Sequence, residues 1–264
     1  MDAVRTDSAV RLDTPARADA DGVGNKLHIA VVGSGGAAFA AALRAADEGA
    51  SVTMVEAGTL GGTCVNVGCV PSKIMIRGAH IAHLLVEHPF AGIGRQAPVV
   101  DRRALVAQQQ ARVEELRHAK YESILESRAQ SIRLLRGAAR FQDARTLIVT
   151  LPNGGTEAVR ADRIMIATGA SPAIPDVPGL KGTPYWTSTE ALVAGDLPEH
   201  LIVYGGSVVA LELAQAFLRL GSEVTLVARS TLLSKEDPAI GAEHSRVLEG
   251  EGMRVLTHTT LREI

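Results

Sequence analysis

The sequence is poor in aromatic residues, in charge of one sign and in long apolar runs. Phe, Trp and Tyr make up 3% of its 264 residues, too few for the stacking platforms that bind single-stranded nucleic acid. A formal net charge of -2 gives no electrostatic reason to expect nucleic acid or an anionic membrane as partner. No apolar run approaches the roughly 20 residues that span a bilayer. We therefore expect neither nucleic acid nor a membrane as partner.

Cysteine is also scarce, because the chain has 2 cysteines and both lie in one short segment. A secreted disulfide framework spreads an even set of cysteines over the chain, so this usage indicates redox chemistry in the cytoplasm. Residues 1–26 mix Asp, Arg and Ala without the continuous apolar stretch of a secretory signal, and we expect a disordered tail there.

An internal repeat organises the rest of the chain. The segment VVGSGGAAFAAALRAADEGASVTMVE, from Val31, aligns without a gap with VYGGSVVALELAQAFLRLGSEVTLVA, from Val203. Each copy reads as strand, glycine turn, helix, glycine stop and strand, the opening of a dinucleotide-binding βαβ unit. We therefore expect an α/β fold with two Rossmann-like dinucleotide-binding domains, over residues 27–195 and 196–264, the second of them truncated.

The first copy carries the pattern G-x-G-x-x-A as Gly33, Gly35 and Ala38. The first glycine allows a tight turn, the second lets a pyrophosphate approach the helix N-terminus, and the alanine permits close helix–strand packing. Glu56 ends the following strand, where a carboxylate binds ribose hydroxyls. This set suits an adenosine diphosphate without extra phosphate, as in FAD. A glycine-rich turn in another α/β fold is the alternative.

The second copy keeps Gly205 but has Ser207 in place of the middle glycine. Ala228 stands where the first copy has its acid, and Arg229 and Lys235 follow it. Losing the acid and gaining cations suits the 2′-phosphate of NADPH. The alternative is that both cations are solvated surface charges.

Between the copies, the pattern predicts helices from Pro71 to about Glu87 and from Asp101 to about Ser127. Short strands are expected at residues 133–136, 146–149 and 163–166. Prolines 172, 175 and 178 then indicate a linker before the second copy.

The segment GGTCVNVGCVPSK, from Gly61 to Lys73, carries both cysteines and follows the first copy closely. Cys64 and Cys69 are near enough in sequence to close a small, strained and reducible disulfide. The helix expected at Pro71 and the charge of Lys73 would both lower a thiol pKa. The fold carries this segment along the bound dinucleotide, so the pair is predicted to be redox-active.

Other roles fit the cysteines less well. A structural disulfide is rare in the cytoplasm, and a pair of buried thiols would not need this glycine, proline and lysine setting. Zinc ligation with His80 and His83 would require unusual ligand spacings, and both histidines lie well down the expected helix.

The cysteine segment, with the glycine pattern before it and Ala167-Thr168-Gly169 after it, resembles the class I pyridine nucleotide-disulfide oxidoreductases. The resemblance runs from about Leu27 to the end of the chain. Within that family, the stretches GSGGAA, IMIRGAHIAHL and PYWTSTEAL are most similar to the mercury-reducing members. The lipoamide-reducing members share the PSK ending and are the nearest alternative.

This resemblance implies FAD and NADPH as cofactors and Hg(II) thiolate complexes as the substrate, reduced to Hg(0). Cys64 resembles the interchange thiol that meets the substrate, and Cys69 the thiolate against the flavin. Together they would hold Hg(II), a soft ion that thiolates suit. The other positions that match family contacts to FAD or to the nicotinamide are Ala38, Glu56, Gly58, Thr63, Lys73, Ala139, Thr168, Gly169 and Glu212.

Several parts of the family pattern do not appear in the sequence. These are a second ATG segment, a strand ending in Gly-Asp, the dimerisation domain, the C-terminal cysteine pair and an amino-terminal C-x-x-C domain. We therefore expect an incomplete chain, inactive alone, from an enzyme that is a homodimer at full length. A truncated, non-catalytic FAD-binding product is the alternative.

Overall fold

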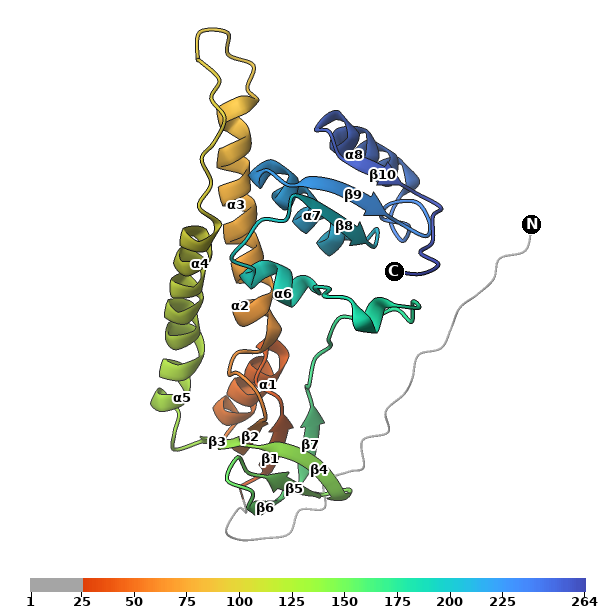
Figure 1. Ribbon diagram of the computed structural model, residues 1–264. Helices are drawn as coiled ribbons and strands as arrows, with labels where there is room; N and C mark the ends of the chain where they lie inside the picture. Colours follow the sequence, from red (N-terminus) through yellow and green to blue (C-terminus); the bar gives the residue numbers. More distant parts are fainter. Residues whose placement is uncertain (1–25) are drawn as a thin grey trace, which may run out of the picture.

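Strands and helices alternate through most of the computed structural model, which describes residues 26–264 (Figure 1). The tail expected over residues 1–26 lies outside the described residues except for Lys26. The strands are β1 His28–Val32, β2 Ser51–Glu56, β3 Ile132–Arg136, β4 Ala138–Asp143, β5 Thr146–Thr150, β6 Thr156–Arg160, β7 Arg163–Ile166, β8 His200–Tyr204, β9 Glu223–Val227 and β10 Arg254–Leu256. The helices are α1 Gly36–Asp47, α2 Gly62–Val67, α3 Cys69–Val86, α4 Arg102–Arg117, the π-helix η1 His118–Glu122, α5 Ser123–Ser127, the 3-10 turn η2 Leu180–Gly182, α6 Ser188–Val193, α7 Val208–Leu220 and α8 Pro238–Gly250.

A parallel sheet of order β3-β2-β1-β7 forms the first half of the structure. α1 covers it with the buried side chains of Ala38, Phe39 and Ala42, and the two alanines are small enough for the helix to lie close to the strands. Val31 and Met54 are fully buried in the same hydrophobic cluster. Because all four strands run in parallel, their carboxyl ends lie along one edge of the sheet.

The sequence repeat is also a repeat in geometry. The Gly33 N–H donates to the Val55 carbonyl over 2.8 Å, and the equivalent Gly205 N–H donates to the Val227 carbonyl over 2.9 Å. Both glycines have positive φ, +113° and +146°, a conformation that side chains disfavour. The two glycine turns therefore leave their strands in the same way.

The second parallel sheet has the order β10-β9-β8. Leu213, Ala214 and Phe217 of α7 are buried in the hydrophobic cluster on this sheet, as is Leu248 of α8. The strand β10 lies beyond the pair of strands that the sequence analysis expected here. Its residues are only partly buried, so their pattern carries little periodic signal.

A separate antiparallel sheet of order β4-β5-β6 follows β3. The sequence analysis identified only its central strand, in which Leu147 and Val149 are both fully buried. The edge strand β4 is almost entirely exposed and shows no apolar alternation. The Gly137 N–H donates to the Glu56 carbonyl over 2.9 Å, so β4 starts beside the end of β2.

α3 links the two halves of the structure. It lies beside both α4 and α7 in Figure 1, and its Met75, Ala79 and Ala82 belong to the same hydrophobic cluster as α7. Ala191 and Leu192 of α6 join that cluster. The hydrophobic packing therefore continues across the boundary expected at residues 195 and 196, and that boundary stays a prediction.

The expected helices are confirmed, with local differences. α3 starts at Cys69, ahead of Pro71, and the helix expected from Asp101 is divided into α4, η1 and α5. Asp101 caps it, since its side chain accepts from the Ala104 N–H over 3.0 Å. α2, α6 and α8 were not expected, and the first two have 6 residues each, too short for a clear helical period.

A partly buried ion pair joins α7 to the end of α8. Arg219 Nε and Nη2 donate to the two carboxylate oxygens of Glu251 over 2.7 and 2.6 Å, and Gln215 Nε2 donates over 2.8 Å. Burial alone would raise the pKa of Glu251, but the Arg219 hydrogen bond and charge, helped by His83 and Gln215, hold that pKa below its ordinary value.

We predict that Glu251→Gln lowers the free energy of unfolding by about 2 kcal/mol at pH 7, because the partly buried Arg219 loses its negatively charged partner. A carboxyl with a depressed folded pKa stabilises above its unfolded pKa of about 4.3, and that contribution is lost as pH falls through the folded value. The loss on substitution should therefore shrink in acid. Urea unfolding measures it, with Glu243→Gln, which breaks an exposed pair on α8, as a near-neutral control. If the substitution lowered the free energy of unfolding equally at pH 7 and in acid, the stabilisation would not come from the ionised Glu251 carboxylate.

Candidate active site

The first glycine turn is closed by backbone contacts. A Cβ at Gly33 would lie 2.2 Å from the carbonyl oxygen of Ala167, at the end of β7. Thr168 and Gly169 follow directly and are exposed, so they lie at the same carboxyl edge of the sheet as the turn. Gly35 precedes the first residue of α1, whose first turn leaves N–H groups without partners in the helix.

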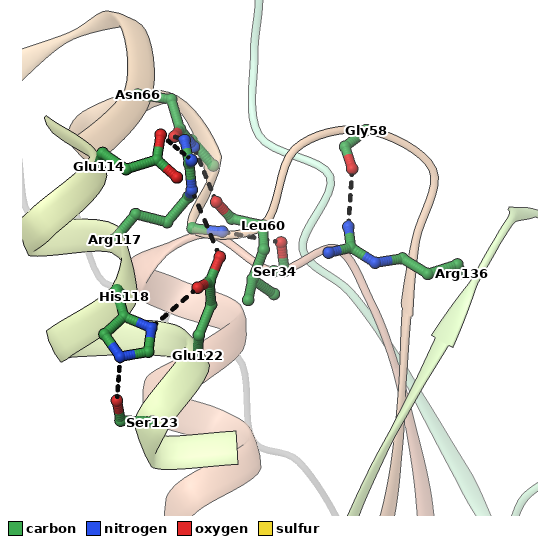
Figure 2. A network of polar contacts seen from close by, with 12 residues as sticks. Ser34, Gly58, Leu60, Asn66, Glu114, Arg117, His118, Glu122, Ser123 and Arg136 are labelled. Carbon is green, nitrogen blue, oxygen red and sulfur yellow. Dashed lines mark hydrogen bonds and ion pairs between the residues drawn. The ribbon is translucent and has the colours of Figure 1, made fainter. Parts of the chain in front are cut away.

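Glu56 is held by the protein itself at the end of β2. Its carboxylate accepts from Ser34 Oγ over 2.5 Å and from the Gly58 N–H over 2.6 Å. Ser34 is buried, and its Oγ also accepts from the Gly61 N–H over 3.2 Å. Figure 2 shows Ser34 close to the loop of residues 57–61 that follows β2. In this loop, the Gly58 carbonyl accepts from Arg136 over 2.9 Å. The ribose contact expected of Glu56 stays a prediction.

Ser34 was missed by the sequence analysis, although it stands inside the glycine pattern. A buried hydroxyl needs hydrogen-bond partners, and Ser34 finds them on β2 and on the cysteine segment. It therefore connects the glycine turn, the terminal acid and the loop that leads to the cysteines.

The cysteine segment also approaches the glycine turn through its backbone. A Cβ at Gly62 would lie 2.6 Å from the Gly35 Cα, and Gly62 has φ +66°. The preceding Gly61 has φ +95°, and its Cβ would lie 2.6 Å from Val65 Cγ1. Glycine at both positions allows the chain to turn sharply into α2 while it lies against the turn before α1.

Both cysteines are exposed free thiols at the junction of α2 and α3. A hydrogen bond to Cys69, followed by burial and the charge of Cys69, raises the pKa of the Cys64 thiol. The sequence analysis predicted a lowered thiol pKa, and for Cys64 that prediction is wrong. The hydrogen bond stabilises the neutral form of the Cys64 thiol. Lys73 pairs instead with Glu212.

Lys73 Nζ lies 2.5 Å from Glu212 Oε1, so this ion pair joins α3 to α7 across the two halves of the structure. Both residues were selected from the sequence for separate cofactors, and the structure brings them together. The pair is partly exposed, with 59% and 35% of the two side chains accessible, so its contribution to stability is small.

The remaining predicted site residues fall into four places. Thr63 is exposed on α2 beside Cys64, and Ala139 lies on β4 opposite Val149. Gly205 and Ser207 form the second turn, before α7. Arg229 and Lys235 are exposed in the segment that follows β9.

The profile of the family described as pyridine nucleotide-disulphide oxidoreductase matches residues 27–264, and the chain belongs to that family. The family expected from the cysteine segment is thereby confirmed. A mercuric reductase from Shigella flexneri is 61% identical over 253 residues, 96% of this chain and 45% of that protein. A mercuric reductase from Acidithiobacillus ferrooxidans is 60% identical over 242 residues, 91% of this chain and 44% of that protein.

The chain spans about half the length of the curated relatives it matches. Among solved structures, the Cu(II) complex of RclA, a HOCl-induced flavoprotein disulfide reductase from Escherichia coli, superposes with a TM-score of 0.77 at 27% identity. That superposition covers 91% of this chain and 51% of RclA. The expected similarity to mercury-reducing members is confirmed at the level of sequence.

No helix among residues 26–264 has both the length and the apolar character needed to cross a membrane. No group of three or more His, Cys, Asp or Glu side chains in this range is arranged to hold a metal ion.

We predict that Cys69→Ala increases the rate at which iodoacetamide alkylates Cys64 at pH 8. Removing Cys69 removes the hydrogen bond and the charge that raise the pKa of Cys64, so more of Cys64 is thiolate. Mass spectrometry of the quenched reaction measures the rate. Ser72→Ala is the matched control, because the Ser72 hydroxyl donates to the Cys69 carbonyl over 3.2 Å rather than to a thiol. A rate that stays the same or falls would show that Cys69 does not control Cys64.

Proposed function

We propose that this chain is the cofactor-binding and cysteine-bearing part of a cytoplasmic, NADPH-dependent flavoprotein that reduces Hg(II) to Hg(0). The observation that carries the proposal is the exposed Cys64–Cys69 pair, held beside the first turn of α1 by the approach of Gly62 to Gly35. The mercuric reductases among the relatives support the choice of substrate. The complete protein is proposed to be a homodimer, as in the family.

The first turn fits the adenosine diphosphate part of FAD. A Cβ at Gly35 would lie 3.7 Å from the Gly62 Cα, an ordinary contact. Gly35 precedes the N-terminus of α1, where N–H groups and the helix dipole favour a pyrophosphate. Gly33, Ala38, Glu56, Gly58, Thr63, Ala139, Thr168 and Gly169 are the other proposed contacts, and Lys73 is proposed to lie near the flavin ring. When bound, FAD supplies two-electron exchange between a nicotinamide and a disulfide.

The second turn is proposed to bind NADPH. Gly205 repeats the hydrogen bond of Gly33, and Ser207 starts α7 where the first copy has Gly35. Arg229 and Lys235 are exposed after β9 and would meet a 2′-phosphate. Glu212, paired with Lys73, is proposed to lie near the nicotinamide. On this view, residues 27–195 and 196–264 are the two dinucleotide-binding domains, and the second is incomplete.

The cysteines supply the ligands that a soft ion prefers. Cys64 is exposed on α2 and would take Hg(II) from its thiolate carriers, while Cys69 would complete a two-thiolate site. The overall reaction converts Hg(SR)2, NADPH and H⁺ to Hg(0), NADP⁺ and two RSH. A reduced thiol pair of this kind would also reduce a disulfide such as lipoamide, so that substrate belongs in the test.

The test uses the complete product of the reading frame that encodes this chain. Cys64→Ser should keep a long-wavelength absorbance from the Cys69 thiolate to the oxidised flavin, and Cys69→Ser should abolish it. NADPH-dependent Hg(II) reduction should fall by at least about 100-fold in both variants. Each variant retains one thiolate, whereas the proposed site holds Hg(II) between two. Release of Hg vapour and the visible spectrum measure these effects.

Two outcomes would contradict the proposal. If both serine variants retained wild-type mercury reduction with added thiol, the chemistry would not lie at Cys64 and Cys69. If the wild-type protein reduced lipoamide but released no Hg(0), the lipoamide alternative would replace mercury as the substrate.

We predict that Arg229→Glu raises the KM for NADPH about tenfold or more, through loss of one charge-assisted contact to phosphate and gain of repulsion. The KM for NADH should change far less, because NADH lacks the 2′-phosphate. Steady-state kinetics with both cofactors measure the difference. Equal changes in the two KM values would show that Arg229 does not recognise the 2′-phosphate.

A further inference from the structure

Asn66 lies between the two cysteines in sequence, and its side chain closes the turn that leads into α2. Its Nδ2 donates to the Leu60 carbonyl over 2.8 Å and to the Gly62 carbonyl over 2.9 Å. These bonds use both N–H groups of the amide, so only Oδ1 remains to accept. Because α2 has 6 residues, it is too short to be stable alone and depends on such contacts.

Arg117, the last residue of α4, supplies the remaining bond. Its Nη1 donates to Asn66 Oδ1 over 3.1 Å, as Figure 2 shows. Its Nη2 pairs with Glu114 over 2.6 Å, and its Nε lies 3.5 Å from Glu122. Only 18% of the Arg117 side chain is exposed. Because Glu114 and Glu122 both pair with the Arg117 guanidinium, its effect on Asn66 is mainly geometric.

The π-helix η1 begins directly after Arg117 and directs a second side chain at the same turn. A Cβ at Gly61 would lie 3.3 Å from the Tyr121 ring, which also packs edge-on against Phe39 at 4.6 Å between centroids. Burial, then the charges of Cys64 and Cys69, raise the pKa of the Tyr121 hydroxyl. π-helical turns are often found at functional sites.

We propose that Asn66 and Arg117 are positioning residues that hold Cys64 within bonding reach of Cys69. The amide of Asn66 fixes the first turn of α2, and Arg117 fixes the amide from α4. Without them, the turn would sample more conformations, and the two sulfurs would meet less often. The inference rests on the proposed function only in taking the pair as redox-active, and it requires neither flavin nor mercury.

The experiment measures disulfide formation against glutathione in the 264-residue chain, which has no cysteines besides this pair. Two electrons and two protons pass from the Cys64–Cys69 dithiol to one glutathione disulfide, which leaves two glutathione thiols. Acid quenching, alkylation and mass spectrometry give the equilibrium constant. Arg117→Ala and Asn66→Ala should each lower it about tenfold, the effect expected from losing a hydrogen bond that involves a charged group or closes a turn.

Arg112→Ala is the matched control, because Arg112 also lies on α4 but makes only an exposed pair with Glu115. It should leave the constant unchanged. Arg117→Lys keeps the charge but not the forked geometry, and it should fall between wild type and Arg117→Ala. If Arg117→Ala does not fold, Arg117→Lys and Asn66→Ala decide the result, with circular dichroism as the check on folding.

Wild-type constants in folded Arg117→Ala and Asn66→Ala would overturn the proposal. An equal fall in Arg112→Ala would also overturn it, because the effect would then be one of helix stability. A failure of the proposed mercury chemistry would leave this equilibrium unchanged, so the two conclusions fail separately.

Discussion

The approach of two backbones, at Gly35 and Gly62, is the constraint on which the candidate site depends. The Cβ that any other residue would add at Gly62 would lie 2.6 Å from the Gly35 Cα, closer than real Cβ contacts. This contact places the segment with Cys64 against the turn where the proposed FAD pyrophosphate meets α1. Ser34 strengthens the contact, because its buried hydroxyl binds both Glu56 at the end of β2 and the Gly61 N–H. The Gly35–Gly62 contact and the Ser34 hydrogen bonds thus fix the position of the cysteine segment relative to the proposed cofactor site.

The strands and helices that depend on local pattern were predictable from the sequence. The repeat predicted that two units would leave their strands alike, and the hydrogen bonds of Gly33 and Gly205 agree. The agreement extends to side chains, since His28 Nε2 lies 2.9 Å from Thr53 Oγ1 and His200 Nε2 lies the same distance from Thr225 Oγ1. The cysteine segment also predicted the family, because its residues are unusual enough to be specific.

The contacts that the sequence analysis missed join residues far apart in the chain. No local pattern pairs Asn66 with Arg117, or Lys73 with Glu212, because these distances depend on how α3, α4 and α7 pack. The expectation of a lowered thiol pKa fails for Cys64 for a different reason: it considered the helix and Lys73 but not the hydrogen bond between Cys64 and Cys69, which raises the pKa of Cys64. The exposed strand β4 left no apolar alternation in the sequence.

The most direct test of this account compares Gly62→Ala with Gly78→Ala in the complete gene product. Gly78 lies on α3, where an added Cβ meets nothing closer than 3.9 Å, so its substitution controls for the alanine itself. The account predicts that the wild type and Gly78→Ala purify with FAD and show the thiolate–flavin absorbance once two electrons have reduced the cysteine pair. Gly62→Ala should not show this absorbance, whether or not the variant retains FAD. A Gly62→Ala protein with wild-type flavin content and an unchanged absorbance would contradict the claim that this backbone contact positions the cysteines at the cofactor.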